Sequence, residues 1–134
     1  MRKTLAIITA FATASVLSAC STGGDGRACI EVPQEIMDRI AEGANGVPIT
    51  PIAAGAVTPE GFSDATVIAM SFDAAGNEAV GTWLITGTVD NPGLTMSVDA
   101  MAESFTDWPS EYKGTPLRKL VDGKTEAKSC IPSN

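Results

Sequence analysis

The chain has 134 residues, with nine basic and 16 acidic side chains and no histidine, and its formal net charge is −7. A negative surface repels nucleic acid and anionic lipid headgroups, so neither is an expected binding partner. The lack of histidine removes the commonest general base and the commonest transition-metal ligand. No phosphate-binding loop, dinucleotide-binding motif, nucleophile elbow or EF-hand loop is present in the sequence. We therefore expect no cofactor, no metal site and no enzyme activity.

The first twenty residues have the pattern of a bacterial export signal. Arg2 and Lys3 give a positively charged start, and residues 4–16 form an apolar stretch of the length found in signal peptides. That stretch is shorter than the roughly 20 apolar residues of a transmembrane helix, and it contains threonine and serine. It leads into Leu17-Ser18-Ala19-Cys20, where a cysteine directly follows two small residues. This segment resembles the signal of bacterial lipoproteins.

The lipoprotein resemblance implies that residues 1–19 are cleaved and that Cys20 carries a thioether-linked diacylglycerol, often with a further acyl chain on the new amine. Two or more acyl chains anchor a protein stably, whereas one chain is marginal. The protein is then expected on the extracytoplasmic side of the cell membrane or of an outer membrane. Cleavage leaves 115 residues with a net charge of −9. Residues 20–28 would form the lipidated cysteine and a flexible tether, and residues 29–134 a single globular domain.

Cys29 and Cys130 lie near the two ends of the expected domain. An exported protein meets an oxidising compartment, where such a pair is expected to form a disulfide. The alternatives are two separate buried thiols or a metal site with two cysteine ligands, and the lack of histidine disfavours the second. A bridge that closes a loop of about 100 residues contributes up to about 4.7 kcal/mol in the chain-entropy model. We predict a structural disulfide.

The hydrophobic pattern predicts an α+β domain. Pro33 and the helical spacing of Ile36, Met37 and Ile40 predict a first helix that stops at Gly43. Residues 44–59 are rich in glycine and proline, so they are expected to be loop with an edge strand over residues 53–57. Residues 65–72, 79–89 and 94–98 predict three strands, joined by turns at residues 73–78 and 90–93.

Tight hairpins at both turns would place Phe72 opposite Ala79 and Val89 opposite Leu94. Threonine and serine side chains of these strands then fall on one face, as in a sheet with one solvated side. Apolar side chains fall on the other face: Ile68, Met70, Phe72, Trp83, Ile85, Val89, Leu94, Met96 and Val98. This predicts an antiparallel meander of three to four strands with helices packed on one face. Gly81 and Gly87 are expected to make room for methionine side chains or for a helix.

Residues 99–108 predict a helix that Pro109 ends, with Met101, Phe105 and Trp108 covering the sheet. Asp99, Glu103 and Asp107 would form an acidic row on its other side. We expect a solvated face there, although a divalent cation would also relieve the repulsion between these carboxylates. Residues 110–116 are expected to be loop, Thr115-Pro116 to begin a helical turn, and the residues after Gly123 to form a last helix ending near Cys130.

Basic side chains gather in one segment near the C-terminus. Residues 113–128 carry a net charge of +3, whereas the rest of the expected mature chain carries about −12. The five basic residues are Lys113, Arg118, Lys119, Lys124 and Lys128. They form either an ordinary solvated surface or a docking patch for an envelope protein or an anionic envelope polymer.

The folded part has Gly81-Thr82-Trp83, then Val98-Asp99-Ala100-Met101-Ala102, Phe105 and Trp108, and the late Cys130. In these residues it resembles small uncharacterised lipoproteins of actinobacteria and their phages. The resemblance covers about 50 residues, its motifs consist of packing residues, and it implies no particular activity.

Two functions follow as hypotheses. The first is a lipid-anchored, extracytoplasmic binding or accessory domain without catalytic activity, of which a phage-derived protein that excludes competing phage is one form. The second is a small envelope hydrolase that uses two carboxylates, which a pocket containing two acids of raised pKa would indicate. The sequence leaves the oligomeric state open.

Overall fold

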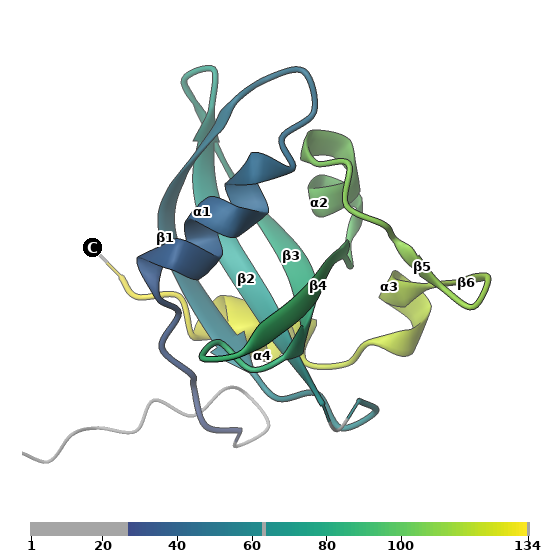
Figure 1. Cartoon of the computed structure of the whole chain (residues 1–134). Coiled ribbons are helices and arrows are strands. Elements are labelled where there is room, and N and C mark those ends of the chain that lie inside the picture. The colour runs from purple at the N-terminus through teal and green to yellow at the C-terminus, as the bar shows by residue number, and fades with distance from the viewer. Residues whose placement is uncertain (1–26, 63, 134) are drawn as a thin grey trace, which may run out of the picture.

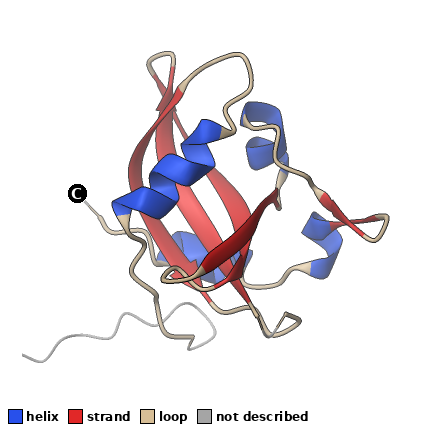
Figure 2. Ribbon diagram, viewed as in Figure 1, coloured by secondary structure: helices blue, strands red, loops and turns tan. Residues whose placement is uncertain are grey.

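The computed structural model describes residues 27–62 and 64–133, which form an α+β domain (Figures 1 and 2). One antiparallel sheet has the strand order β1-β2-β3-β4, which confirms the predicted meander. The expected signal peptide at residues 1–19, Cys20 and the tether up to residue 26 lie outside the described residues. The strands are β1 (Ile49–Val57), β2 (Ala65–Ala74), β3 (Asn77–Gly87) and β4 (Pro92–Ser97).

The first helix and the edge strand are confirmed. Helix α1 (Gln34–Glu42) follows Pro33 and ends at Gly43, whose N–H donates to the carbonyl of Ile40 at 3.2 Å. The strand expected at residues 53–57 is the second half of β1, which lies at the edge of the sheet. β1 begins earlier than predicted because an edge strand tolerates Pro51, at which the pairing with β2 is irregular.

Helices cover both faces of the sheet, which corrects the expectation that they pack on one face. In Figure 1, α1 crosses in front of the sheet and α4 (Lys124–Ser129) lies behind it. The physical reason is visible in β2, where residues 65–70 are apolar at odd as well as at even positions, so both faces must be covered. The α1 side buries Ile36, Ile40, Ile68, Met70, Phe72, Trp83 and Ile85. The other side buries Val57, Val67, Leu84, Met96, Val98, Leu117 and Ala127.

The β2–β3 hairpin has the predicted register, with Phe72 paired with Ala79. Its two-residue turn is Ala75-Gly76, in which both residues have positive φ, as a type I′ hairpin turn requires. Gly81 lies where the ring of Trp83 folds over the strand, and a Cβ at position 81 would collide with that ring. Gly81 therefore makes room for the ring of Trp83. The prediction that a methionine side chain or a helix occupies this space is wrong.

The predicted register of the β3–β4 hairpin, with Val89 opposite Leu94, is wrong. Gly87 pairs with Pro92, and the register is irregular between Gly87 and Ile85. Ile85 then pairs with Thr95, three residues from Val98, its partner in the predicted register. An odd shift turns every side chain of β4 to the opposite face. Met96 therefore packs on the α4 side, and Leu94 is exposed. The cause is the left-handed conformation of Gly87, with φ of 82°, which ends β3 two residues early.

Threonine and serine side chains of the strands, expected on a solvated face, are also buried. Thr82 and Ser97 are inaccessible, and Thr95 is only 4% exposed. The hydroxyl of Ser97 lies 3.1 Å from that of Thr106, which also accepts the indole N–H of Trp83 at 3.0 Å. The hydroxyls of Ser97 and Thr106 thus form a buried polar contact beside the indole of Trp83.

The helix predicted over residues 99–108 is shorter. α2 (Ala100–Phe105) begins after Asp99, whose carboxylate accepts the N–H of Ala102 at 2.9 Å. It ends because the backbone becomes extended at Thr106, whose hydroxyl donates to the carbonyl of Ala102 at 2.6 Å. Ala102 is therefore the buried residue of this helix, and Met101 is exposed, contrary to the prediction.

The C-terminal elements follow the predicted order. The expected loop at residues 110–116 contains a small hairpin of β5 (Glu111–Tyr112) and β6 (Thr115–Pro116). The helical turn that starts after Pro116 is α3 (Leu117–Leu120), and α4 begins after Gly123 and ends at Cys130. In Figure 1 the hairpin projects from the body of the domain beside β4.

Candidate functional site

A disulfide joins the two ends of the described domain. Cys29 and Cys130 are bonded, with their Cα atoms 5.5 Å apart, which confirms the predicted pairing. The end of α4 reaches the sheet because Gly55 in β1 has no side chain, and a Cβ there would collide with the backbone of Cys130. The bridge therefore fixes the C-terminal helix to the edge strand as well as to the N-terminal segment.

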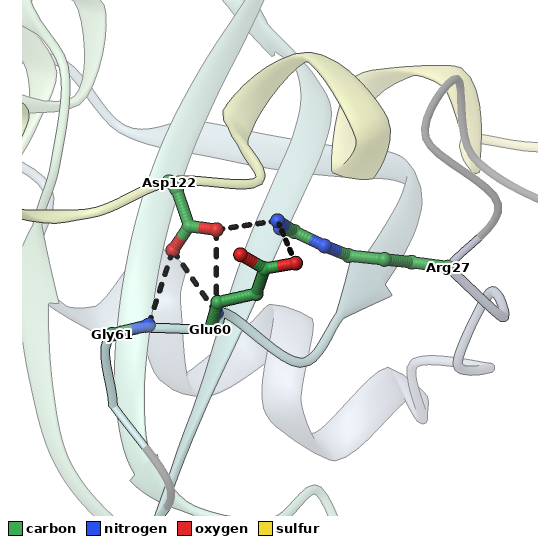
Figure 3. A network of polar contacts seen from close by, with 4 residues as sticks. All are labelled: Arg27, Glu60, Gly61 and Asp122. Carbon is green, nitrogen blue, oxygen red and sulfur yellow. Dashed lines mark hydrogen bonds and ion pairs between the residues drawn. The ribbon is translucent and has the colours of Figure 1, made fainter.

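A second contact holds the start of the domain. Arg27, the first described residue, donates from Nη2 to Asp122 Oδ2, and Nη2 also lies 3.6 Å from Glu60 Oε1. Asp122 accepts the backbone N–H of Glu60 at 3.1 Å and that of Gly61 at 3.4 Å. Figure 3 shows how these four residues converge from the segment before Cys29, the loop after β1 and the loop before α4. We call them the Asp122 cluster.

The pKa of the Asp122 carboxyl lies below its ordinary value of 3.8. Burial is the largest single influence and acts to raise the pKa, but the N–H of Glu60, the guanidinium of Arg27 and the N–H of Gly61 together outweigh it. A general acid at neutral pH needs the opposite shift, so this carboxylate has the properties of a structural acceptor. The sequence analysis missed the cluster, since no local motif links residues this far apart in the chain.

The acidic row predicted along Asp99, Glu103 and Asp107 does not form. Asp99 caps α2 and accepts the N–H of Thr82 at 3.2 Å, while Asp107 lies beyond the end of the helix. Glu103 lies 3.7 Å from the guanidinium of Arg118. Across residues 27–62 and 64–133, no three cysteine, aspartate or glutamate side chains are grouped closely enough to hold a metal ion.

The five residues of the basic segment make different contacts in the fold. Arg118 and Lys128 form ion pairs, both at 3.7 Å, with Glu103 and Asp99 of the α2 region. Lys124 donates to the carbonyl of Arg118 at 2.9 Å. Lys119 is exposed on α3, and Lys113 lies at the tip of the β5–β6 hairpin, with its ammonium 5.3 Å from the centroid of the Tyr112 ring. Whether these residues dock a partner stays a prediction.

A groove lies between β4 and the β5–β6 hairpin. Its volume is about 470 Å³, within the usual range for ligand sites. We call it the β4 groove; it is lined by Arg39 of α1, by Leu94, Thr95 and Met96 of β4, by Trp108 and Pro109, and by Glu111, Tyr112 and Lys113. Lys113 is thus the one residue of the predicted docking patch that also lines this groove.

Both ends of the β4 groove are fixed by contacts within the fold. Arg39 donates from Nη2 to the carbonyl of Gly93, and Trp108 donates its indole N–H to the carbonyl of Ile40 at 2.9 Å. Tyr112 packs edge-on against Phe62, with ring centroids 5.9 Å apart. The sequence analysis assigned Leu94 to the core, so it missed the groove. The signal available was Gly87, which interrupts the alternating pattern before the turn.

A second hollow brings two carboxylates to one place. Asp64 and Asp90 both line a space of about 300 Å³ beside Thr66 and Gly87. Two acids in one hollow are the minimum that the carboxylate hydrolase hypothesis requires.

No family model, no curated protein and no solved structure matches this chain. Among the described helices, none combines the length and the apolar character needed to cross a membrane.

Proposed function

We propose that the chain is a lipid-anchored, extracytoplasmic binding domain without catalytic activity, held close to the membrane through Cys20. The support from the sequence is the charged start, the apolar stretch and Leu17-Ser18-Ala19-Cys20. The observation that carries the proposal is the position of Arg27. This residue is already fixed to Asp122, and Cys29 is fixed two residues later by the disulfide.

Only seven peptide steps separate Cys20 from Arg27. A fully extended chain of that length spans at most about 25 Å. The proposed anchor therefore keeps the domain next to the lipid surface, with the Asp122 cluster on the near side. The β2–β3 turn lies at the opposite end of the sheet (Figure 1). The β4 groove is lined by residues of β4 and of the β5–β6 hairpin. A partner is then most accessible if it is an envelope protein near the same membrane.

Metabolic labelling with a fatty-acid analogue tests the anchor. We expect label on the wild-type protein and its recovery with membranes, and no label on Cys20→Ser, which should accumulate as unprocessed precursor because lipid attachment depends on the cysteine sulfur. Cys29→Ser with Cys130→Ser is the matched control, since it also replaces cysteines with serine but leaves Cys20 intact, and it should remain labelled. An unlabelled wild-type protein, or a labelled Cys20→Ser variant, would refute the proposal.

The hydrolase remains the second candidate because Asp64 and Asp90 line one hollow. Its test is release of soluble fragments from purified cell-wall polymer by the full chain in detergent. Activity that is lost in both Asp64→Asn and Asp90→Asn, but retained in Asp107→Asn, would replace the binding proposal with this one. We expect no release by any of the four proteins.

A further inference from the structure

Exposed apolar side chains gather beside the loop after β1. Leu94 is 70% exposed, Tyr112 43% and Leu120 39%. Leu94 and Tyr112 line the β4 groove together, and the Tyr112 ring packs edge-on against the partly exposed Phe62 of that loop. The residue before Phe62 is Gly61, where an added Cβ would lie 3.7 Å from the carbonyl oxygen of Leu120. We call Phe62, Leu94, Tyr112 and Leu120 the apolar face.

The apolar face adjoins the contacts that hold the start of the domain. Gly61 donates its N–H to Asp122, and Asp122 also accepts from Arg27, so the three residues meet in one place (Figure 3). Seven peptide steps lead from Arg27 back to Cys20, a length of at most about 25 Å. A lipid anchor at Cys20 therefore brings this face, and not the far end of the sheet, within reach of the bilayer.

Two lysines flank the apolar face. Lys113 directly follows Tyr112, and Lys119 directly precedes Leu120. Within the described part of the chain, neither lysine is paired with a carboxylate. A lysine can lay its apolar stem along an apolar surface while its ammonium group reaches lipid phosphates, and tyrosine is enriched at the same level of a bilayer. The residue types therefore fit the interface between lipid and water.

Burial of apolar area, rather than net charge, would hold this face to lipid. The exposed acids Glu60 and Glu111 border the face and offset the two lysines, and the whole chain is negative. A neutral phospholipid surface fits these charges better than an anionic one. An anchored domain also needs little further attraction, because a short tether keeps the two surfaces at a high effective concentration. A few exposed apolar side chains are then enough.

We propose that the apolar face docks the domain onto the surface of the bilayer that holds its anchor. Leu94, Tyr112 and Leu120 enter the interfacial layer, and Lys113 and Lys119 contact lipid phosphates. The inference rests on the proposed lipid anchor and adds the orientation of the anchored domain. The β2–β3 turn, at the opposite end of the sheet, then points away from the membrane toward other envelope proteins.

Tryptophan fluorescence of the full chain in phosphatidylcholine vesicles tests the docking, because bromine on the lipid acyl chains quenches an indole only at short range. We expect the fluorescence that Leu94→Trp adds to fall about twofold or more in brominated vesicles, since position 94 enters the interfacial layer. Val80→Trp is the matched control, an exposed apolar position of β3 towards the β2–β3 turn, and its added fluorescence should not change. The native Trp83 and Trp108 contribute the same background to both variants.

A second set of variants tests whether the face docks as a unit. With Leu120→Trp as the reporter, adding Leu94→Glu should reduce the quenching at least about twofold, because a carboxylate is costly to bury in lipid. Adding Val80→Glu changes the net charge equally and should leave the quenching unchanged. The quenching should also persist in 1 M salt, where charges are screened beyond about 3 Å. Quenching that disappears in salt would mean that charge, and not the apolar face, holds the domain to lipid.

Equal quenching of Leu94→Trp and Val80→Trp would overturn the docking. If the occupant of the apolar face is instead a protein, whether a second copy of this chain or another envelope protein, Leu94→Trp stays unquenched in vesicles of lipid alone, which overturns the proposal as well. Sedimentation of the vesicles separates this inference from the anchor on which it rests. A chain that sediments without quenching loses only the docking, whereas a chain that stays in solution has no anchor, and both proposals are then wrong.

Discussion

Asp122 shows how one side chain joins three segments of the chain. Its carboxylate accepts from Arg27 and from the backbone N–H groups of Glu60 and Gly61. These donors hold its pKa below 3.8, so the charged form is bound more tightly in the folded state. The stabilisation is complete above about pH 3.8, and it is lost as the pH falls through the lower pKa of the folded state.

We therefore expect Asp122→Asn to lower the free energy of unfolding by about 1 kcal/mol at neutral pH, a modest value because the site is partly exposed. Urea unfolding of both proteins at pH 7 and pH 3 measures the difference, which should shrink in acid as wild-type Asp122 becomes protonated. Asp107→Asn is the matched control, since this exposed aspartate lies beyond the end of α2. A difference that persists or grows at pH 3 would contradict the assignment.

Thr106 provides the hydrogen-bond acceptor for the buried indole N–H of Trp83. Its hydroxyl donates to the carbonyl of Ala102 and accepts the indole N–H of Trp83, and both Trp83 and Thr106 are buried. Thr106→Val keeps the shape of the side chain but leaves the indole N–H unpaired, which costs about 1–3 kcal/mol. Chemical denaturation measures the loss. Thr125→Val, the same change on the exposed face of α4, should stay within about 0.5 kcal/mol.

At the scale of elements, the disulfide holds α4 and the N-terminal segment on the edge of the sheet. Cys29→Ser with Cys130→Ser should lower the free energy of unfolding by about 2–4 kcal/mol, since the unfolded chain regains the freedom of a long loop. The four-stranded sheet should survive, because its two cores are built from strand and helix side chains on either side. Thermal unfolding followed by circular dichroism measures both effects. Wild-type protein in reductant should unfold at the same midpoint temperature as the double variant. Free thiols at Cys29 and Cys130 in the non-reduced protein would contradict the bond.

The elements themselves follow from local patterns in the sequence. Pro33 and Gly43 bracket α1, and Ala75-Gly76 specifies a turn of only two residues, so the β2–β3 register has a single solution that buries Phe72. The β3–β4 register is not specified in the same way. Gly87 takes a left-handed conformation and ends the strand early, and the alternating pattern after it fits either face of the sheet.

The candidate site was less predictable than the fold for a related reason. The β4 groove depends on the exposure of Leu94, which the incorrect register places in the core, and on Arg39, which is separated from Lys113 by most of the domain sequence. The disulfide was predictable because its chemistry allows few partners. Arg27 and Asp122 have many alternative partners in a chain with 16 acids, so their pairing could not be chosen from sequence.

On the scale of the whole molecule, the fold distributes charge more evenly than the sequence suggests, because basic side chains of one segment lie beside acids of another. The segment 113–128 is net positive, but Arg118 and Lys128 are paired with acids of the α2 region, and Lys124 contacts a backbone carbonyl. Arg118 and Lys128 remain about half exposed, so these ion pairs lower the positive potential of the segment without removing it. This disfavours binding along an anionic polymer.

We therefore expect the full chain in detergent not to be retained on immobilised polyphosphate, even at low ionic strength. An extended polyanion needs several unpaired cations, and at low ionic strength the net charge of −7 repels it over a longer range. Chromatography of the wild-type protein and of Lys113→Glu with Lys119→Glu measures this, and both should elute together without delay. The double variant should also unfold within about 0.5 kcal/mol of the wild type, since both lysines are exposed. Retention of the wild type that falls with salt and is absent from the double variant would instead establish the basic segment as a polymer-docking patch.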